Sequence, residues 1–279
     1  MTMPTQYDRP HSLSEALALA AQPGALALAG GALAFGQMSV PYEHIVDLQG
    51  VPELKVVESS DVGLRIGSAV MLSALLAREE LPAALKTSLT RAISPNILNG
   101  ASVGESLLLR AHPLLREWFA CLIALGAAAE TIDPARGPNH RERHLLLTAT
   151  SRLEHEVITT LVLPPFGPRV GLGTAQVSRT PADASIVNAA ACVHFDEAGK
   201  VSSAMAALGG VSDAPVEGHA LGSLSGWPLN HETAEAAAEE IAEHLMPVGD
   251  YLGSAEYRRA MAAICLARAL EACVPATEA

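Results

Sequence analysis

The sequence is poor in cysteine, and the cysteines that it has are widely spaced. The four residues are Cys121, Cys192, Cys265 and Cys273, and none of them forms a C-x-x-C pair that could clamp zinc or an iron–sulfur cluster. All four lie among apolar residues. We therefore expect buried, reduced thiols that act as small hydrophobic side chains.

Basic residues are also scarce. The 18 Lys and Arg residues are outnumbered by 30 Asp and Glu residues, which gives a formal net charge of −12. No basic run or basic helix face offers the cations that replace counterions along a nucleic acid, so we expect no nucleic-acid partner. No stretch reaches the ~18 apolar residues of a membrane span, and residues 1–6 lack the pattern of a signal peptide. A soluble cytoplasmic protein is expected.

Familiar catalytic motifs are missing as well. The sequence contains no nucleophile elbow, no Walker loop and no paired carboxylates, and no catalytic triad can be assembled. His140 and His144 have the spacing of a helical metal pair, but the turn residues before them and the β-like sequence after them favour a solvated loop. Glu154-His155-Glu156 is better explained as charges at a strand edge, because neighbours on a strand point to opposite faces. Any chemistry would therefore depend on a bound cofactor.

Two glycine-bearing segments are the best candidates for a cofactor site. An apolar strand over 25–29 runs into Gly30-Gly31, and a second loop of small residues covers 101–106. Loops of this kind can direct several backbone N–H groups at one pyrophosphate, which holds an anion without a basic side chain. Two ordinary turns are the alternative, and spacing alone would favour them.

Hydrophobic periodicity and turn residues predict a mixture of helices and strands. A capping box, Ser12-x-x-Glu15, predicts the first helix, which Pro23-Gly24 ends. The segment 94–106 is typical of a loop, and Pro164-Pro165 marks a boundary. Further helices are expected at 71–78, 82–93, near 115–126, 231–245 and 254–273, and strands at 25–29, 45–48, 55–58, 64–68, 144–148 and 157–163, with a hairpin of 186–195 and 201–208.

The order of several motifs resembles one known family. In sequence order the motifs are Arg9-Pro10-x-Ser12-Leu13-x-Glu15-Ala16-Leu17, Leu28-Ala29-Gly30-Gly31, Val46-Asp47-Leu48 with Val51-Pro52-Glu53-Leu54, Gly63-Leu64-Arg65-Ile66-Gly67-Ser68, Asn99 to Ser106, Ala207-Leu208-Gly209-Gly210-Val211, and Gly253 to Arg259. Over nearly its whole length the chain resembles the FAD-binding medium subunit of the molybdenum hydroxylases, the family of carbon monoxide dehydrogenase and xanthine dehydrogenase.

The resemblance implies an α+β fold. A vanillyl-alcohol-oxidase-type FAD-binding region of two α/β subdomains, 1–54 and 55–165, would precede a small C-terminal domain, 170–279, with an antiparallel sheet and helices. In the family, FAD lies between these regions. It receives electrons from iron–sulfur clusters in a small subunit, which a molybdenum centre in a large subunit supplies, and it passes them to NAD or another acceptor. The chain would be an oxidoreductase subunit that relays electrons and contains no metal itself.

The same resemblance implies which residues contact FAD. They are Leu28, Ala29, Gly30, Gly31, Ala32, Leu33, Asn99, Ser102, Val103, Gly104, Glu105, Ser106, Asp183 and Leu208. None of them is expected to be catalytic in its own right.

Three departures from the family pattern leave a choice of functions. Ala32 and Leu33 replace polar residues that help to hold the cofactor, and Glu105 replaces the second glycine of the second loop, which places a carboxylate where a pyrophosphate would approach. The first hypothesis is an FAD-carrying electron-transfer subunit, and the alternative is a flavin-free structural subunit with the same fold and docking surfaces. A free-standing small-molecule-binding module is a weaker third. We favour FAD binding, because backbone donors do most of the cradling.

Overall fold

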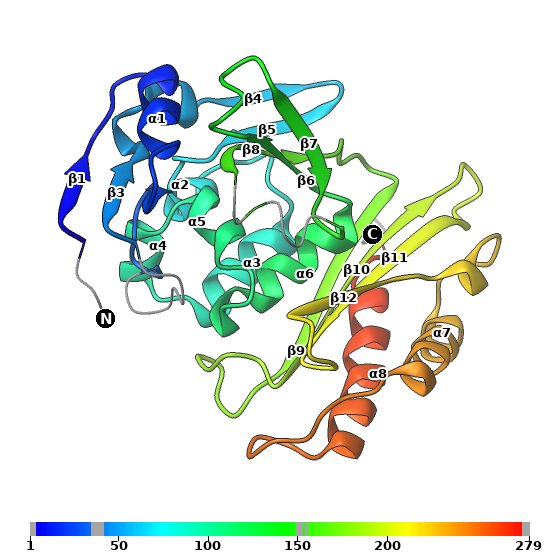
Figure 1. Cartoon of the computed structure of the whole chain (residues 1–279). Coiled ribbons are helices and arrows are strands. Elements are labelled where there is room, and N and C mark those ends of the chain that lie inside the picture. Colours follow the sequence, from blue (N-terminus) through cyan, green and yellow to red (C-terminus); the bar gives the residue numbers. More distant parts are fainter. Residues whose placement is uncertain (1–3, 35–41, 149–152, 154–155, 275–279) are drawn as a thin grey trace. The chain divides into compact units, whose positions relative to one another are not determined.

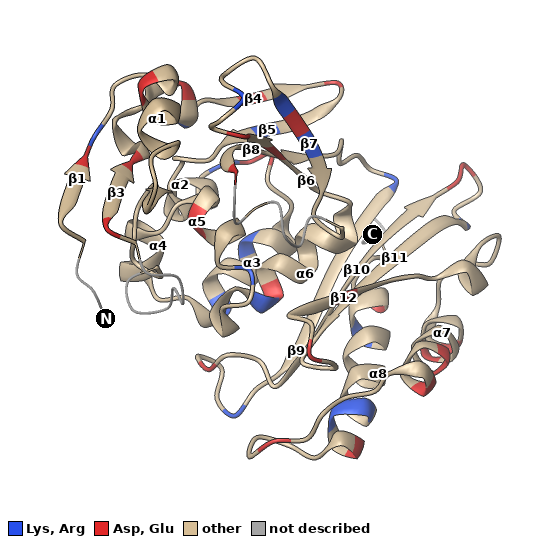
Figure 2. Cartoon of the chain, in the orientation of Figure 1, with Lys and Arg blue, Asp and Glu red and all other residues tan. Residues whose placement is uncertain are grey.

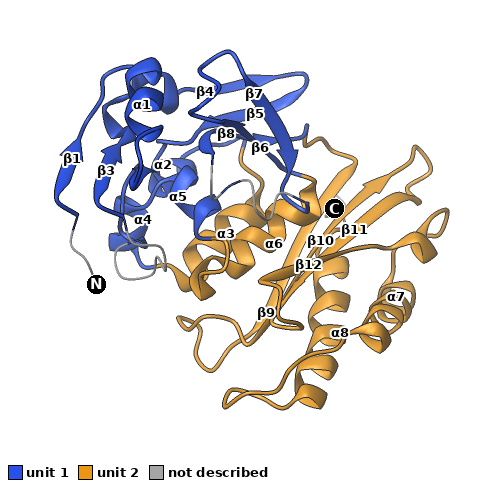
Figure 3. Cartoon of the chain, in the orientation of Figure 1, with its two compact units in different colours: residues 1–80, 94–109, 127–165 blue, residues 81–93, 110–126, 166–279 orange. Residues whose placement is uncertain are grey.

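The computed structural model describes residues 4–34, 42–148, 153 and 156–274 of the 279-residue chain. The chain folds into two compact units, each assembled from three stretches of sequence (Figure 3). Unit 1 comprises residues 1–80, 94–109 and 127–165, and unit 2 comprises 81–93, 110–126 and 166–279. Two stretches of the predicted middle domain therefore group with the C-terminal part of the chain, and the last change of unit falls at Pro164-Pro165.

Unit 1 begins with a small α/β layer around helix α1 (Leu13–Ala20). The predicted cap is present in part: the Ser12 side chain accepts a hydrogen bond from Glu15 N at 3.2 Å, whereas the Glu15 carboxylate accepts one at 2.9 Å from His11 N, the residue before the N-cap, and not from Ser12 N as in a capping box. Satisfying these N–H groups fixes where the helix begins. Beside it lies a parallel sheet of strand order β1-β3-β2, with β1 at Gln6–Asp8, β2 at Ala25–Leu28 and β3 at His44–Asp47.

A second, antiparallel sheet completes unit 1 (Figure 1). Its strand order is β4-β5-β8-β6-β7, with β4 at Val57–Ser60, β5 at Gly63–Gly67, β6 at Ala128–Ile132, β7 at Arg141–Leu145 and β8 at Val157–Leu163. Strand β8 lies in the middle of the sheet and all of its residues are buried. Its sequence is accordingly a continuous apolar and threonine run rather than an alternating one.

The short helices of unit 1 correct one prediction. The segment 94–106, expected to be a loop, contains helix α4 (Pro95–Gly100) and most of helix α5 (Val103–Leu108). Proline is suited to the first helical position, and Ser102 caps α5 by accepting a hydrogen bond from Glu105 N. The glycines and asparagines that suggested a loop lie at or near the helix ends. The remaining pieces are α2 (Leu72–Leu76) and the 3-10 turns Leu48–Gly50 and Pro52–Lys55.

A bidentate ion pair spans the second sheet. Arg65 Nη1 and Nη2, on β5, each lie 2.6 Å from a carboxylate oxygen of Glu130, on β6. The Arg65 guanidinium, mainly through these hydrogen bonds, lowers the pKa of Glu130 from its ordinary value of 4.5. A carboxyl whose pKa is lower in the folded state stabilises the fold above its unfolded pKa, and this stabilisation is lost as the pH falls through the folded pKa.

We therefore expect Arg65→Met to lower the free energy of unfolding by up to about 1 kcal/mol at pH 7. The loss should shrink as Glu130 becomes protonated, because a neutral partner gains little from the guanidinium. Urea unfolding followed by circular dichroism at neutral and acidic pH measures the change, and a double-mutant cycle with Glu130→Gln isolates the pair. An equal loss at both pH values would show that the contact is not electrostatic.

Unit 2 is built on a four-stranded antiparallel sheet of order β12-β11-β10-β9. The bounds are β9 at Val170–Val177, β10 at Val187–Phe195, β11 at Val201–Gly209 and β12 at Val216–Ala220. The predicted hairpin is confirmed as β10 and β11, with Ala190 paired to Ala207. The helices are α3 (Ala83–Ala92), α6 (Arg116–Leu125), α7 (His231–His244) and α8 (Ala255–Glu271), with 3-10 turns at Pro113–Leu115 and Gly222–Leu224.

Helices cover the sheet of unit 2. Helix α8 packs on β9 and β10, α7 packs on α8, and α6 packs on β10 and β11 (Figure 1). Alternate residues of β10, such as Val187, Ala189 and Ala191, join Leu266 and Ala269 of α8 in one apolar cluster. Strand β10 is buried along most of its length, and its alanines let the helices approach closely.

Three general expectations can be compared with the fold. All four cysteines are free and buried, as predicted, and burial raises the pKa of Cys121 and Cys192 to about 12, so both thiols are uncharged at neutral pH. Lys and Arg residues are spread over several elements in Figure 2. Within the described ranges, no helix is both long enough and apolar enough to cross a membrane.

Candidate functional site

The Gly30-Gly31 turn directly follows strand β2, as the sequence predicted. Gly30 has φ of +97° and Gly31 has φ of +123°, a backbone that residues with side chains rarely adopt. A Cβ on Gly30 would lie 2.6 Å from Gly100 O and 2.9 Å from Glu105 Oε2. We call the turn after β2 (29–34) the first loop and keep the name second loop for residues 101–106, which include the start of α5. The first loop can lie so close to this part of unit 1 only because glycine occupies position 30.

Backbone N–H groups of the second loop donate hydrogen bonds to acceptors within unit 1. Glu105 N donates to the Ser102 hydroxyl at 3.1 Å, which caps helix α5. The other donors are Val103 N to Val70 O at 2.9 Å, Gly104 N to Ser68 O at 2.8 Å and Ser106 N to Ser102 O at 3.0 Å. These four amides are engaged in holding α5 in place. They are therefore not free to hold an anion.

Three N–H groups of the first loop converge on one carboxylate. Glu105 Oε2 accepts from Gly31 N at 3.0 Å, and Glu105 Oε1 accepts from Leu33 N and Ala34 N, both at 2.8 Å. We call these three N–H groups the loop nest. Glu105 is 1% exposed. Burial raises its pKa, outweighing the opposite effect of the N–H donors. The nest thus holds an anionic side chain from a residue more than 70 positions away.

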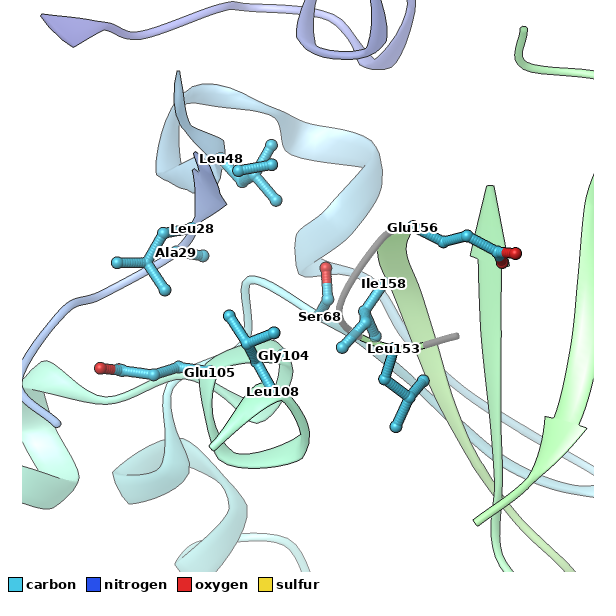
Figure 4. A pocket seen from close by; sticks show the side chains of 11 residues that line it. Leu28, Ala29, Leu48, Ser68, Gly104, Glu105, Leu108, Leu153, Glu156 and Ile158 are labelled. Atoms are coloured by element: carbon cyan, nitrogen blue, oxygen red, sulfur yellow. The ribbon is translucent and has the colours of Figure 1, made fainter. Parts of the chain in front are cut away.

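A pocket lies beside this nest within unit 1. It is small and partly open to solvent, and its lining consists of Ala27, Leu28, Ala29, Leu48, Ser68, Gly104, Glu105, Leu108, Leu153, Glu156 and Ile158. In Figure 4 the Glu105 side chain extends away from Ser68, Ile158 and Leu153. Ser68 is 1% exposed, and its hydroxyl has no hydrogen-bond partner among the described residues. The pocket wall therefore offers one buried polar group that a ligand could use.

Unit 1 brings most of the predicted site residues together. Twelve of the fourteen lie in unit 1, at the end of β2 and in the turn after it or in α4, α5 and the residues between these helices: Leu28, Ala29, Gly30, Gly31, Ala32, Leu33, Asn99, Ser102, Val103, Gly104, Glu105 and Ser106. Leu28 and Val103 are buried apolar side chains, so they could contact a ligand mainly through their backbones. The other two, Asp183 and Leu208, belong to unit 2, where Asp183 is exposed in the β9–β10 connection and Leu208 is 1% exposed in β11.

The sequence did not reveal two features of this site. The motifs that contain Ser68 and Glu156 were not assigned to the cofactor site, and Leu153 belongs to no motif, although all three residues line the pocket. The hydrogen bonds that the Glu105 carboxylate accepts from the first loop were also not predicted. One signal was available: Glu105 is the only charged residue between Arg91 and Arg110, and a charged residue in such an apolar stretch must find a partner or remain solvated.

The two histidine motifs have different outcomes. His140 and His144 are not a helical pair, as expected, but the expected solvated loop is wrong from Arg141 onward, because residues 141–145 form strand β7, which pairs with β6. His144 Nε2 instead lies 3.7 Å from Glu142 and 3.6 Å from Glu156, and one ligand atom from each of these three residues lies within 4.8 Å of the others. Glu154 and His155 lie outside the described residues. The expectation that the chain contains no metal stays a prediction.

These features define an α+β protein of two units with an anion-holding glycine turn. The family described as "FAD binding domain in molybdopterin dehydrogenase" matches residues 3–166, and "CO dehydrogenase flavoprotein C-terminal domain" matches residues 174–273. The chain therefore belongs to the family of FAD-binding medium subunits of the molybdenum hydroxylases, which are oxidoreductases.

Individual relatives are similar over most of the chain. The carbon monoxide dehydrogenase medium chain of Hydrogenophaga pseudoflava is 27% identical over 96% of each chain. The xanthine dehydrogenase FAD-binding subunit of Escherichia coli O157:H7 is 28% identical over 90% of each chain. A solved structure of carbon monoxide dehydrogenase from Hydrogenophaga pseudoflava matches with a TM-score of 0.81 and 24% identity over 98% of each chain, which shows the same fold.

Proposed function

We propose that this chain is the FAD-carrying, electron-relaying medium subunit of a heteromeric molybdenum hydroxylase in the cytoplasm. It would receive electrons from iron–sulfur clusters of a small subunit, which a molybdenum centre in a large subunit supplies, and pass them to NAD or another acceptor. The match of both family domains, in order, along the chain carries this proposal. The vanillyl-alcohol-oxidase-type architecture and the domains 1–54, 55–165 and 170–279 are part of the same proposal.

The first loop has the backbone that an FAD diphosphate requires, since three N–H groups point at one anionic group. That group is the Glu105 carboxylate, and a diphosphate does not fit in the nest beside it. When bound, a flavin supplies the ability to exchange electrons, which no side chain of this chain offers. The flavin-free alternative has less support, because the family match runs through the whole FAD-binding domain.

Purification from the native host tests this proposal. The tagged full-length chain should co-purify with an iron–sulfur subunit and a molybdenum-cofactor subunit, identified by mass spectrometry. In buffers that contain FAD, the washed complex should retain stoichiometric flavin, measured by absorbance and by chromatography of the released cofactor. Both partners without flavin would instead indicate the structural subunit, and a chain that purifies alone would indicate a free-standing binding module.

A further inference from the structure

Glu105 is buried without a basic partner. Its carboxylate is 1% exposed, and within the part of the chain that the structure describes no Lys or Arg forms an ion pair with it. Its charge is compensated by the loop nest, the N–H groups of Gly31, Leu33 and Ala34. Backbone N–H groups that surround an oxyanion in this way are the arrangement by which proteins bind phosphate groups.

The two carboxylate oxygens use all three donors of the nest. The N–O distances of 2.8 to 3.0 Å are those of fully formed hydrogen bonds, so a second anion would find these N–H groups engaged. A second anion would also lie against a buried like charge, and two such charges repel strongly where water is excluded. Glu105 and a diphosphate therefore exclude each other from the nest.

The second loop does not offer a replacement. The amides of residues 103–106 donate to acceptors within unit 1, including the Ser102 hydroxyl that caps α5. Moving those amides would require unwinding the start of α5, whereas moving the Glu105 side chain requires only rotation about its own bonds. The loop nest is thus the anion site that can be freed most easily, because the Glu105 side chain that fills it can rotate away.

We propose that the Glu105 carboxylate is an internal competitor for the anion site of the first loop, so that a dinucleotide diphosphate binds there only when this carboxylate leaves. This inference rests on the proposed function, since it assumes that FAD is the dinucleotide. Its consequence is that Glu105 sets the affinity for FAD: the free chain keeps a closed, hydrogen-bonded loop, and FAD must displace a carboxylate that already satisfies the donors.

Binding of FAD to the purified full-length chain tests the competition, with flavin fluorescence as the signal. Glu105→Ala removes the competitor, and we expect the Kd for FAD to fall at least about tenfold, which corresponds to ~1.4 kcal/mol. Glu105→Gln keeps the side-chain volume but removes the charge, and it should tighten binding to a smaller extent. Glu79→Ala, which removes the same charge from an exposed position in unit 1, should leave the Kd unchanged.

Hydrogen exchange measured by mass spectrometry provides a second readout. In the absence of FAD, a peptide that contains Gly31, Leu33 and Ala34 should exchange faster in Glu105→Ala than in the wild type, because its N–H groups have lost their acceptor. Saturating FAD should slow this exchange again. Circular dichroism checks that each variant is folded, and if Glu105→Ala is unfolded, the Kd and exchange of Glu105→Gln carry the test.

The outcomes separate this inference from the proposed function. If wild type, Glu105→Ala and Glu105→Gln bind FAD equally well, Glu105 does not compete and the inference is overturned, while FAD carriage stands. If none of the folded proteins binds FAD, both the inference and FAD carriage fail. If only the Glu105 variants bind FAD tightly and their loop amides respond as described, the inference is supported.

Discussion

Replacing Arg258 by methionine should lower the free energy of unfolding of unit 2 by about 3 kcal/mol or more. Arg258 lies on α8 and is 5% exposed. Its Nη1 donates to Ile186 O at 2.8 Å and to Gly210 O at 2.9 Å, and its Nη2 donates to Asp250 Oδ1 at 2.7 Å. Methionine keeps the apolar part of the side chain but leaves the two carbonyl groups without this donor.

The magnitude follows from the acceptors left behind. A buried carbonyl that loses its partner costs about 1–3 kcal/mol, and hydrogen bonds from a charged donor lie at the upper end of the range. Two such carbonyls are involved, and the carboxylate of Asp250 loses its partner as well. Arg258 therefore joins the β9–β10 connection, the Gly209-Gly210 turn and the loop before α8 through one side chain.

Urea unfolding followed by tryptophan fluorescence measures this effect in unit 2, because both tryptophans of the chain, Trp118 and Trp227, belong to that unit. Arg169→Met is the matched control. Arg169 has a side chain 61% exposed and, among the residues that the structure describes, forms an ion pair only with the exposed Glu197, so its loss should change stability by less than about 0.5 kcal/mol. Equal losses for the two variants would show that the hydrogen bonds of Arg258 do not stabilise unit 2.

Trp118→Ala is expected to have an effect of similar or larger size, about 3–5 kcal/mol. Trp118 lies on α6, is fully buried, and is the largest side chain with so little exposure. Truncation removes its apolar burial and leaves a cavity beside α6, and the surroundings relax only partly. In a domain of this size the loss corresponds to a Tm lower by roughly 10 °C.

Thermal unfolding followed by circular dichroism checks this prediction. Trp227→Ala is the control, because Trp227 is 62% exposed and its truncation creates no cavity. We expect that control to melt close to the wild type. If both alanine variants melted at the same temperature, the packing around Trp118 would not be the source of stability that its burial indicates.

Elements with strong local signals were predictable from the sequence. The capping residues Ser12 and Glu15 mark the start of α1, and Gly126, with φ of +77°, ends α6 where glycine was expected to stop it. The hairpin of β10 and β11 was also found, because two long strands flank a short turn. In each case the residues that decide the structure are close neighbours in sequence.

Elements with weak local signals were not found. Strands β1, β6, β9 and β12 were missed, and α4 and α5 were taken for a loop. Strands β9 and β12 pair with their neighbours in sequence, β10 and β11. Strands β1 and β6 pair with more distant partners, as in Gln6 with His44 and Ala128 with Val162. Pairings over such separations leave little trace in local propensity.

The candidate site shows the same division. The sequence by itself determined the glycine turn, because only Gly30 and Gly31 can adopt the backbone that places several N–H groups on one side, and it determined that Glu105 is a charged residue among apolar neighbours. Only the tertiary structure decided which groups compensate the charge of Glu105. Packing of α5 on β5 and β8 carries the Glu105 carboxylate to the N–H groups of a loop more than 70 residues earlier. A buried anion must be compensated, and the nearest donors in space, not in sequence, provide the compensation.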